Sequence, residues 1–167
     1  SQMNGANLNW KTNNGGLELS FRVQLSAITD VALFVGFTDQ ISILEMPIQA
    51  SGVADGITTT ATDAVGILFD TAMSTDNWWL VGVANNVDAT AQNLGSAPTA
   101  ATFEHFKIVL DENGNATFYH NFQRVGTVMA GAVSSNVALT PVIAGFSRAA
   151  ASRNLELGAF YLIMDDS

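Results

Sequence analysis

The segment from Thr102 to Val128 constrains the fold of this chain more than any other part of the sequence. It reads TFEHFKIVLDENGNATFYHNFQRVGTV, in which apolar and polar residues alternate on both sides of a polar turn. The turn contains Asn113-Gly114, a pair favoured in tight primed turns because both central residues need positive φ. A short break at 121–123 leads into a further strand, Arg124 to Val128. The segment therefore predicts an antiparallel sheet.

The same two-residue period recurs along most of the chain, and helical periodicity is nearly missing. Alternation or short apolar runs predict strands at residues 17–25, 31–38, 64–69, 78–83, 139–147 and 155–164. Residues 40–63 and 85–101 are instead rich in small and polar residues, and we interpret them as long connections. Long loops in compact domains are uncommon and are often functional or interfacial. The pattern predicts an all-β, two-sheet antiparallel sandwich or a barrel.

Length and composition favour one folded domain. The chain has 167 residues, of which 48% are apolar and 13% charged. This composition argues against disorder, because disordered chains are poor in apolar residues and rich in charge. Neither a linker nor a repeat divides the chain, so we expect an N-terminal arm or first edge strand over residues 1–16 and a single sandwich over residues 17–167. The low charge suggests that a partner covers part of the surface.

Charge and cysteine content exclude several classes of function. The formal net charge is −9 with six basic residues and no basic cluster, so neither a nucleic acid nor an anionic membrane is an expected partner. Cysteine is absent, which excludes disulfides, thiolate nucleophiles and Cys-ligated metals. No apolar run approaches the roughly 20 residues of a membrane helix.

The first and last clear strands begin with the same tripeptide, Leu-Glu-Leu, at residues 17–19 and 155–157. We expect these strands to lie close together. On these residues the chain resembles the concanavalin A-like jelly roll in its laminin-G-like lectin and glucanase form. The strings that carry the resemblance are LELSFRV, AVGILFD, WWLVGV, FKIVLDENGNATFYHNFQRVGTV and LELGAFYLIM. The resemblance implies a jelly-roll sandwich of about 9–12 strands with little or no helix, and says little about function.

A narrower resemblance concerns tailed-phage and prophage virion structural proteins, including those that decorate capsids. The strings LSAITDVALFVGFTD, AVGILFDT, DNWWLVGVANNVDAT and ALTPVIAGFSRAAASRNLEL are similar to such proteins. This resemblance implies a homo-oligomer on the capsid surface of a virion, in contact with the major capsid protein.

The carboxylates give no catalytic pattern. The glucanase branch of this fold places Glu-x-Asp-x-Glu on one strand, where alternation puts all three carboxylates on one face. That string is missing, and the glutamates are scattered. Glu18 and Glu156 are candidate neighbours on adjacent strands, but both alternate with apolar residues, which favours solvent-facing positions. No Gly-x-Ser-x-Gly nucleophile elbow is present either. We therefore predict a protein that is not an enzyme.

The two histidines, His105 and His120, flank the predicted turn and are expected to face each other. Two imidazoles and a carboxylate can hold a metal, but no third ligand has suitable spacing, so a surface or interface pair is favoured. The turn at 111–115 resembles a calcium loop only superficially, because it lacks the twelve-residue spacing and the final Glu. We predict neither a metal nor a cofactor.

Aromatic residues offer a possible sugar site. Trp78 and Trp79 are adjacent in a predicted strand and should point to opposite faces, so one belongs to the core. The other is available to a ligand or a neighbouring subunit. Asp70, Asp76 and Asn77 precede it and can hydrogen-bond sugar hydroxyls. These residues define the alternative function, a carbohydrate-binding, lectin-like module.

Several strands carry apolar residues on both faces, which a simple sandwich does not cover. Phe34 lies between Leu33 and Val35, and the last strand places Phe160, Leu162 and Met164 opposite Tyr161 and Ile163. Cover from a neighbouring subunit is the expected explanation. The leading hypothesis is therefore a non-enzymatic capsid decoration or cement protein that acts through oligomeric and shell contacts.

Overall fold

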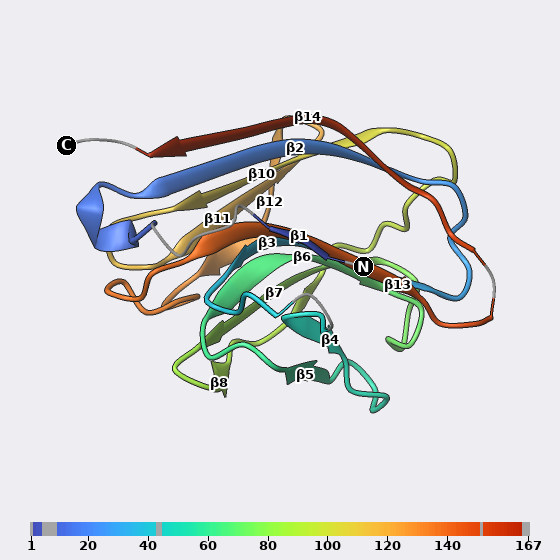
Figure 1. Cartoon of the computed structure of the whole chain (residues 1–167), viewed down its shortest axis with the longest axis horizontal. Coiled ribbons are helices and arrows are strands. Elements are labelled where there is room, and N and C mark those ends of the chain that lie inside the picture. Colours follow the sequence, from blue (N-terminus) through green and yellow to red (C-terminus); the bar gives the residue numbers. More distant parts are fainter. Residues whose placement is uncertain (1, 5–9, 43–44, 151, 165–167) are drawn as a thin grey trace.

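The computed structural model describes residues 2–4, 10–42, 45–150 and 152–164. Within them, two large antiparallel sheets face each other, and a small third sheet lies against one of them (Figure 1). The seven-stranded sheet contains, in spatial order, β1 (Gln2–Asn4), β13 (Thr140–Ser147), β3 (Val31–Thr38), β6 (Ala64–Asp70), β7 (Trp78–Ala84) and β8 (Val87–Asp88), with β9 (Gln92–Asn93) also paired to β7. The five-stranded sheet contains β12 (Gln123–Met129), β11 (Ala116–His120), β10 (Glu104–Leu110), β2 (Leu17–Leu25) and β14 (Leu155–Met164). The small sheet pairs β4 (Ile48–Ala50) with β5 (Ile57–Thr59), and a short 3-10 helix, η1, spans Thr12–Asn14.

The predicted all-β, two-sheet antiparallel sandwich is confirmed. The described residues form fourteen strands, somewhat more than the nine to twelve expected. The difference comes from β1, β4, β5, β8 and β9, which have two or three residues each and are too short to show a period in the sequence. No helix in the described part of the chain is long and apolar enough to cross a membrane.

The main core lies between the two large sheets and is built from alternating side chains. In β2 every second residue from Leu17 to Leu25 is buried, while the residues between them face outward. Phe21 lies opposite Phe106 in the β2–β10 register, and their rings stack with centroids 5.7 Å apart. Trp78 meets Phe106 edge to face at 4.8 Å and so joins the two sheets. Such aromatic pairs stabilise a core beyond the area they bury.

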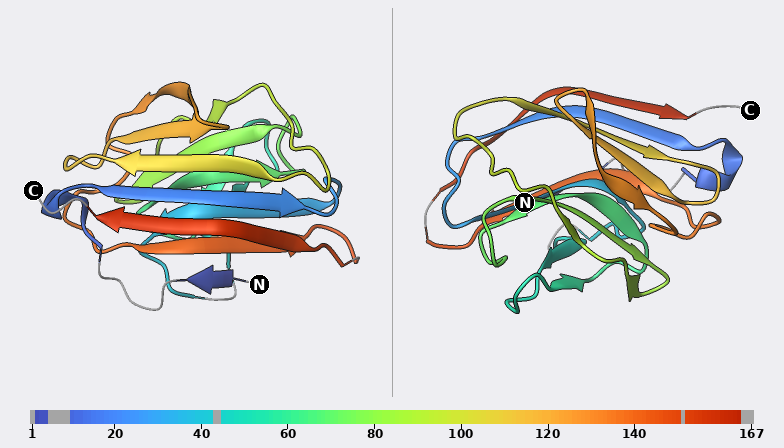
Figure 2. Two further views of the ribbon diagram at one scale, coloured as in Figure 1. Left: turned by 90° about the horizontal axis from the view of Figure 1, so that it is seen from above. Right: turned by 180° about the vertical axis from the view of Figure 1, so that it is seen from behind.

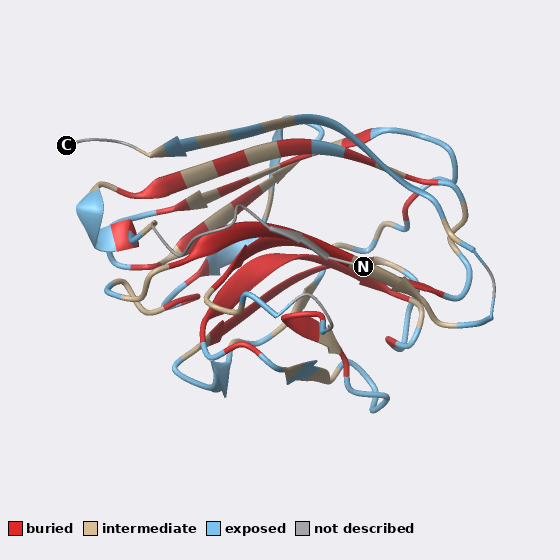
Figure 3. Cartoon of the chain, viewed as in Figure 1, coloured by how far each residue is buried: buried red, intermediate tan, exposed pale blue. Residues whose placement is uncertain are grey.

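A second core covers the other face of the seven-stranded sheet. Every residue of β3 and β6 is buried, as the red strands at the centre of Figure 3 show. The cover comes from the connection at 40–63, whose β4–β5 hairpin lies beneath the curved sheet in Figure 1. Its Met46, Ile48 and Ala50 pack with Phe34 and Leu68 of the sheet. The expectation that a neighbouring subunit covers Phe34 is therefore wrong: a loop of the same chain does so.

The turns differ from the sequence-based interpretation in one respect. Of the Asn113-Gly114 pair, only Gly114 has positive φ (78°), so this connection is not a two-residue primed turn. It is a five-residue loop in which the Asp111 carboxylate accepts hydrogen bonds from the backbone N–H groups of Asn113 and Asn115, both at 2.9 Å. Burial acts to raise the pKa of Asp111, but the hydrogen bonds from Asn115 and Asn113 outweigh it and lower the pKa. The Asp111 carboxylate therefore stabilises the turn.

The two strands that begin with Leu-Glu-Leu are neighbours, as predicted, because β2 and β14 pair along most of their length. Their antiparallel register puts Glu18 opposite Ile163 and Glu156 opposite Gln24. The two glutamates are therefore roughly 20 Å apart along the strands and form no carboxylate pair. In the predicted N-terminal arm, β1 pairs with β13 at the edge of the seven-stranded sheet. Residues 1, 5–9 and 165–167 lie outside the described part, and the division at residue 17 stays a prediction.

Candidate functional site

The two adjacent tryptophans of β7 point to opposite faces of the seven-stranded sheet. Trp78 belongs to the main core with 2% of its surface exposed, and its indole N–H donates to Glu104 Oε2 at 3.1 Å. One of the two tryptophans was predicted to belong to the core, and Trp78 does so; it is therefore not available as a ligand or interface contact. Trp79 belongs to the second core, and its indole N–H donates to the backbone oxygen of Thr75 at 3.3 Å. Of the two, Trp79 alone lines a surface groove.

The polar residues predicted beside the tryptophans have different roles. Asp70 is fully buried, forms an ion pair with Arg148, and accepts the backbone N–H of Ala50 at 2.9 Å. Because these contacts consume its carboxylate, its prediction as a sugar ligand is wrong. Asp76 is exposed but does not line the groove. Asn77 lies at its edge, where its side chain donates to Asn93 Oδ1 at 3.0 Å.

The two histidines do not face each other, because they sit on opposite faces of the five-stranded sheet. His120 lies opposite Phe106 and turns inward, where it stacks on that ring at 4.5 Å and contacts Glu104 Oε2 at 2.6 Å. His105 faces outward, with Nε2 at 2.9 Å from Ser20 Oγ. No group of three His, Cys, Asp or Glu that could hold a metal exists among the described residues.

The apolar residues predicted at an interface divide between two faces of β14. Phe160, Leu162 and Met164 are half-buried against the main core, so they are not an open contact surface. The outward residues Tyr161 and Ile163 are 63% and 55% exposed. β14 is also the edge strand of its sheet. Nothing in the single chain tests the predicted homo-oligomer or a contact with a capsid protein, and both stay predictions.

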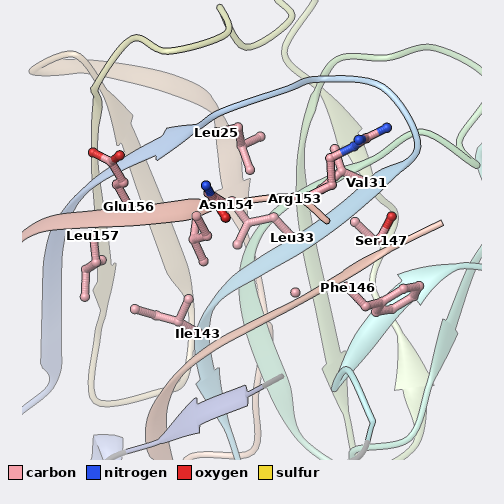
Figure 4. A pocket seen from close by; sticks show the side chains of 13 residues that line it. Leu25, Val31, Leu33, Ile143, Phe146, Ser147, Arg153, Asn154, Glu156 and Leu157 are labelled. Carbon is pink, nitrogen blue, oxygen red and sulfur yellow. The ribbon is translucent and has the colours of Figure 1, made fainter. Parts of the chain in front are cut away.

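Two hollows at the described surface are large enough for a small ligand. One of about 720 Å³ lies at the open edge between the sheets, where side chains from β2, β3, β13 and β14 meet (Figure 4). Leu25, Leu33 and Ile143 line it, and these residues are also members of the main core. This hollow is the splayed end of that core, and Ser147, Arg153, Asn154 and Glu156 add polar groups to its lining.

The other hollow is a groove of about 620 Å³ beside Trp79, which we call the Trp79 groove. Three segments form it: the tip of the β4–β5 hairpin, strand β7, and the connection from β8 to β9. The lining residues are Asp55, Gly56, Ile57, Trp79, Asp88, Ala89, Thr90, Ala91 and Asn93. Sugar-binding grooves in general combine an apolar wall with convergent polar groups, as this one does.

Tight turns bring these segments together. Asn85 and Asn86 have φ of 50° and 62°, the pattern of a primed turn that folds β8 back onto β7. Asp55, at φ 55°, occupies the tip of the β4–β5 hairpin, which a bond from Gly56 N–H to Val53 O closes at 2.9 Å. The turns thus place Asp55 and the β8–β9 connection on either side of Trp79.

The polar side chains of the groove keep hydrogen-bonding capacity for a ligand. Asn93 Oδ1 accepts from Asn77 and from the Gly95 backbone N–H at 2.7 Å, and Nδ2 donates to Thr75 Oγ1 at 2.9 Å, which leaves one amide N–H for a ligand. Asp88 meets Thr59 Oγ1 only at a long 3.5 Å, and Asp55 contacts the hydroxyl of Ser74. An ionised carboxylate has about four acceptor sites, so both aspartates can accept further bonds. None of the described lining residues is Lys, Arg or His, so the groove favours a neutral ligand rich in hydroxyls.

Sequence reasoning identified Trp79 but missed Asp55, Asp88 and Asn93. All three come from the connections at 40–63 and 85–101, whose length did indicate a functional or interfacial role. No local pattern in those segments showed which residues would converge, because the convergence depends on the second core beneath them.

Comparisons with known proteins identify the fold. No protein-family model and no curated protein matches the sequence. Solved structures do match: sheep galectin-11 in complex with glycerol has a TM-score of 0.56 at 8% identity over 98% of this chain and 96% of its own. The carbohydrate-binding module CBM66 from Bacillus subtilis has a TM-score of 0.55 at 7% identity, covering 89% of this chain and 74% of its own. The chain has the concanavalin A-like jelly-roll fold.

One of these similarities corrects the prediction that the chain is not an enzyme. Alginate lyase AlyC3, solved with dimannuronate, has a TM-score of 0.61 at 9% identity over 95% of this chain and 68% of its own. A lyase therefore shares the fold, and the missing Glu-x-Asp-x-Glu string excludes only one of the chemistries that this fold supports. Excluding enzymatic activity on that string was wrong. The matched structures named here carry no link to a phage, so the capsid role and a virion location stay predictions.

Proposed function

We propose that this protein binds a neutral glycan in the Trp79 groove. The observation that carries the proposal is the composition of the groove, in which Asp55, Asp88, Thr90 and Asn93 converge beside Trp79 without a cation. Two carboxylates, a hydroxyl and an amide match the hydroxyl groups of a sugar, which both donate and accept. An anionic glycan would meet repulsion from the two aspartates.

Trp79 supplies an apolar floor and not an open stacking platform, because only 3% of its surface is exposed. Specificity therefore depends mainly on hydrogen bonds from the rim. The names of two matched structures, a galectin and a carbohydrate-binding module, support a glycan as the ligand. The alginate lyase was solved with dimannuronate, which is acidic, so it supports a glycan but not a neutral one. Sequence identities of 7–9% make that support one of fold.

The test is a glycan array followed by calorimetry with the best neutral oligosaccharide. Asn93→Ala and Asp88→Asn should each weaken binding by roughly three- to tenfold, since each removes one or two hydrogen bonds to the ligand. Asp76→Asn is the matched control, because it removes a carboxylate that is exposed but lies outside the groove. Its affinity should equal that of the wild type.

The same incubations should be examined for cleaved products, because two carboxylates in one groove can also serve acid–base chemistry. Turnover that Asp88→Asn removes would make the protein a glycan-active enzyme that uses this groove. Equal affinity of Asn93→Ala, Asp88→Asn and wild type would refute the groove as the binding site.

A further inference from the structure

Phe122 is an outlier in both exposure and backbone conformation. It is 81% exposed, the largest value among the exposed large apolar side chains of the described residues. With Asn121 it forms the turn between β11 and β12, where the two residues have φ of 48° and 69°. Glycine is preferred at the second position, and a bulky residue with positive φ is strained. Packing of the core does not explain this strain, since the ring lies outside it.

The ring of Phe122 is held in place by His105. The two rings stack with centroids 4.4 Å apart and an interplanar angle of 14°, which leaves the other face of Phe122 open. His105 is fixed in turn by Ser20 Oγ at 2.9 Å, and its backbone N–H donates to Asn121 Oδ1 at 3.1 Å. The ring is therefore ordered before any ligand arrives, which lowers the entropic cost of binding.

Basic residues lie near this ring on the outer face of the five-stranded sheet. The left view of Figure 2 shows the strands of this sheet from above. Arg22 lies directly opposite His105, and Lys107 is two residues further along β10. Arg124 lies opposite Tyr119, which is itself opposite Lys107. Three of the six basic residues of an acidic chain thus share one face.

The state of His105 reflects this surrounding charge. Burial lowers its pKa, and the positive charges of Arg22 and Lys107 lower it further. Its Nδ1 is the one buried side-chain polar atom without a hydrogen-bond partner among the described residues, so an imidazolium would lack an acceptor there. His105 is therefore neutral at pH 7, and the positive potential beside Phe122 comes from Arg22 and Lys107.

We propose that Phe122, Arg22 and Lys107 form a second binding site, which takes a carboxylated sugar such as a uronic-acid unit of an acidic polysaccharide. The apolar face of a pyranose fits the open face of Phe122, and its carboxylate reaches a guanidinium or an ammonium. Both cations are held in position, because Arg22 lies 4.9 Å over the ring of Phe103 and Lys107 lies 4.7 Å over that of Tyr119. This site is independent of the Trp79 groove.

Glu18 competes with the carboxylate ligand for Lys107. Glu18 contacts Lys107 at 3.3 Å, with about a third of each side chain exposed. Exposed pairs of this kind contribute little, so a ligand carboxylate can displace Glu18 or share the ammonium with it. A nucleic acid is a poorer fit, because three cations on an acidic protein neutralise few phosphates.

The test compares oligogalacturonate with its fully methyl-esterified form, which keeps the sugar rings and removes the charges. Calorimetry at low salt should show at least tenfold weaker binding of the ester. Phe122→Gly, which relieves the backbone strain, should keep or raise Tm while weakening binding of the acid by roughly tenfold. Arg22→Gln and Lys107→Gln should each weaken it severalfold, and added salt should weaken it further.

Lys11→Gln is the matched control, because Lys11 is exposed and precedes η1, outside this sheet. Equal losses from Lys11→Gln and Arg22→Gln would mean unspecific attraction and would overturn the proposal. Equal affinity for acid and ester, or no binding of the acid, would do the same. Oligothymidylate is a further arm: binding that depends on Phe122 would assign the site to single-stranded nucleic acid instead. Groove variants such as Asn93→Ala should leave oligogalacturonate binding unchanged, which separates this proposal from the proposed function.

Discussion

The two large sheets of this sandwich differ in the face that points away from the main core: one is covered by other parts of the chain, and the other is not. The seven-stranded sheet is covered by the β4–β5 hairpin, which buries Phe34, Leu68 and Trp79 in a second apolar core. The five-stranded sheet has no such cover in the described residues. Its outer face carries polar and charged side chains of β2 and β10, and the exposed Tyr161 and Ile163 of β14. The extent to which an outer face is buried does not by itself show which sheet binds a partner.

The contrast explains why the two candidate sites differ in charge. On the covered sheet, ligand contacts come from loops at the margin of the second core, and those loops supply aspartates and an amide. On the uncovered sheet, β2, β10 and β12 supply the cations, and the β11–β12 turn supplies Phe122. Strand side chains have fixed spacing, whereas loop side chains are placed by turns. The two sites therefore suit a neutral and an acidic glycan respectively.

The largest expected effect is on the free energy of unfolding, and it tests whether the second core stabilises the fold as much as the main core does. Phe21→Ala, in the main core, should cost about 3–5 kcal/mol in the free energy of unfolding. Phe34→Ala should cost a similar amount if the hairpin is a true part of the fold, because both rings are fully buried. Urea unfolding measures both. A loss below about 1 kcal/mol for Phe34→Ala, with the full loss for Phe21→Ala, would show that the hairpin is a detachable lid.

The next effect concerns the ion pair at the edge of the second core. Arg148 pairs with the buried Asp70, which also accepts the β4 backbone N–H of Ala50. Arg148→Gln leaves this carboxylate buried without its cation and should cost about 3 kcal/mol. Arg153→Gln is the matched control, since its partner Asp30 is 59% exposed and 3.7 Å away, and it should cost less than about 1 kcal/mol.

Thermal and urea unfolding of the two arginine variants decide this point. Similar small losses for both would mean that Asp70 is hydrated or protonated without Arg148, and that the pair does not anchor the hairpin. The two substitutions remove the same charge, so a difference between the variants comes from their contacts. Arg148 pairs with the buried Asp70 and lies over the ring of Phe146, whereas Arg153 pairs with the exposed Asp30 and donates to Thr29 O at 2.8 Å.

The sequence predicts the sandwich because strand alternation is local, and β2 and β10 show it in full. The second core was not predictable in this way. β3 and β6 are apolar on both faces, which shows that cover is needed but not whether a loop or a subunit gives it. His120 illustrates the same limit. Which way it faces depends on the register across the turn, and the five-residue loop at 111–115 sets that register. The Trp79 groove was even less predictable from the sequence, because only turns bring its lining residues together.

The smallest effect is a pH dependence on the bare face. The folded-state pKa of His105 lies below its usual 6.5, so the unfolded chain takes up the proton more readily. The stability that neutral His105 contributes is therefore complete above pH 6.5 and is lost as the pH falls from there towards the lowered pKa. Wild type should lose more unfolding free energy between pH 7.5 and pH 5 than His105→Gln, in which a glutamine amide can still meet Ser20. Identical losses would mean that burial and the charges of Arg22 and Lys107 together do not lower the pKa of His105, which would contradict a net positive field beside Phe122.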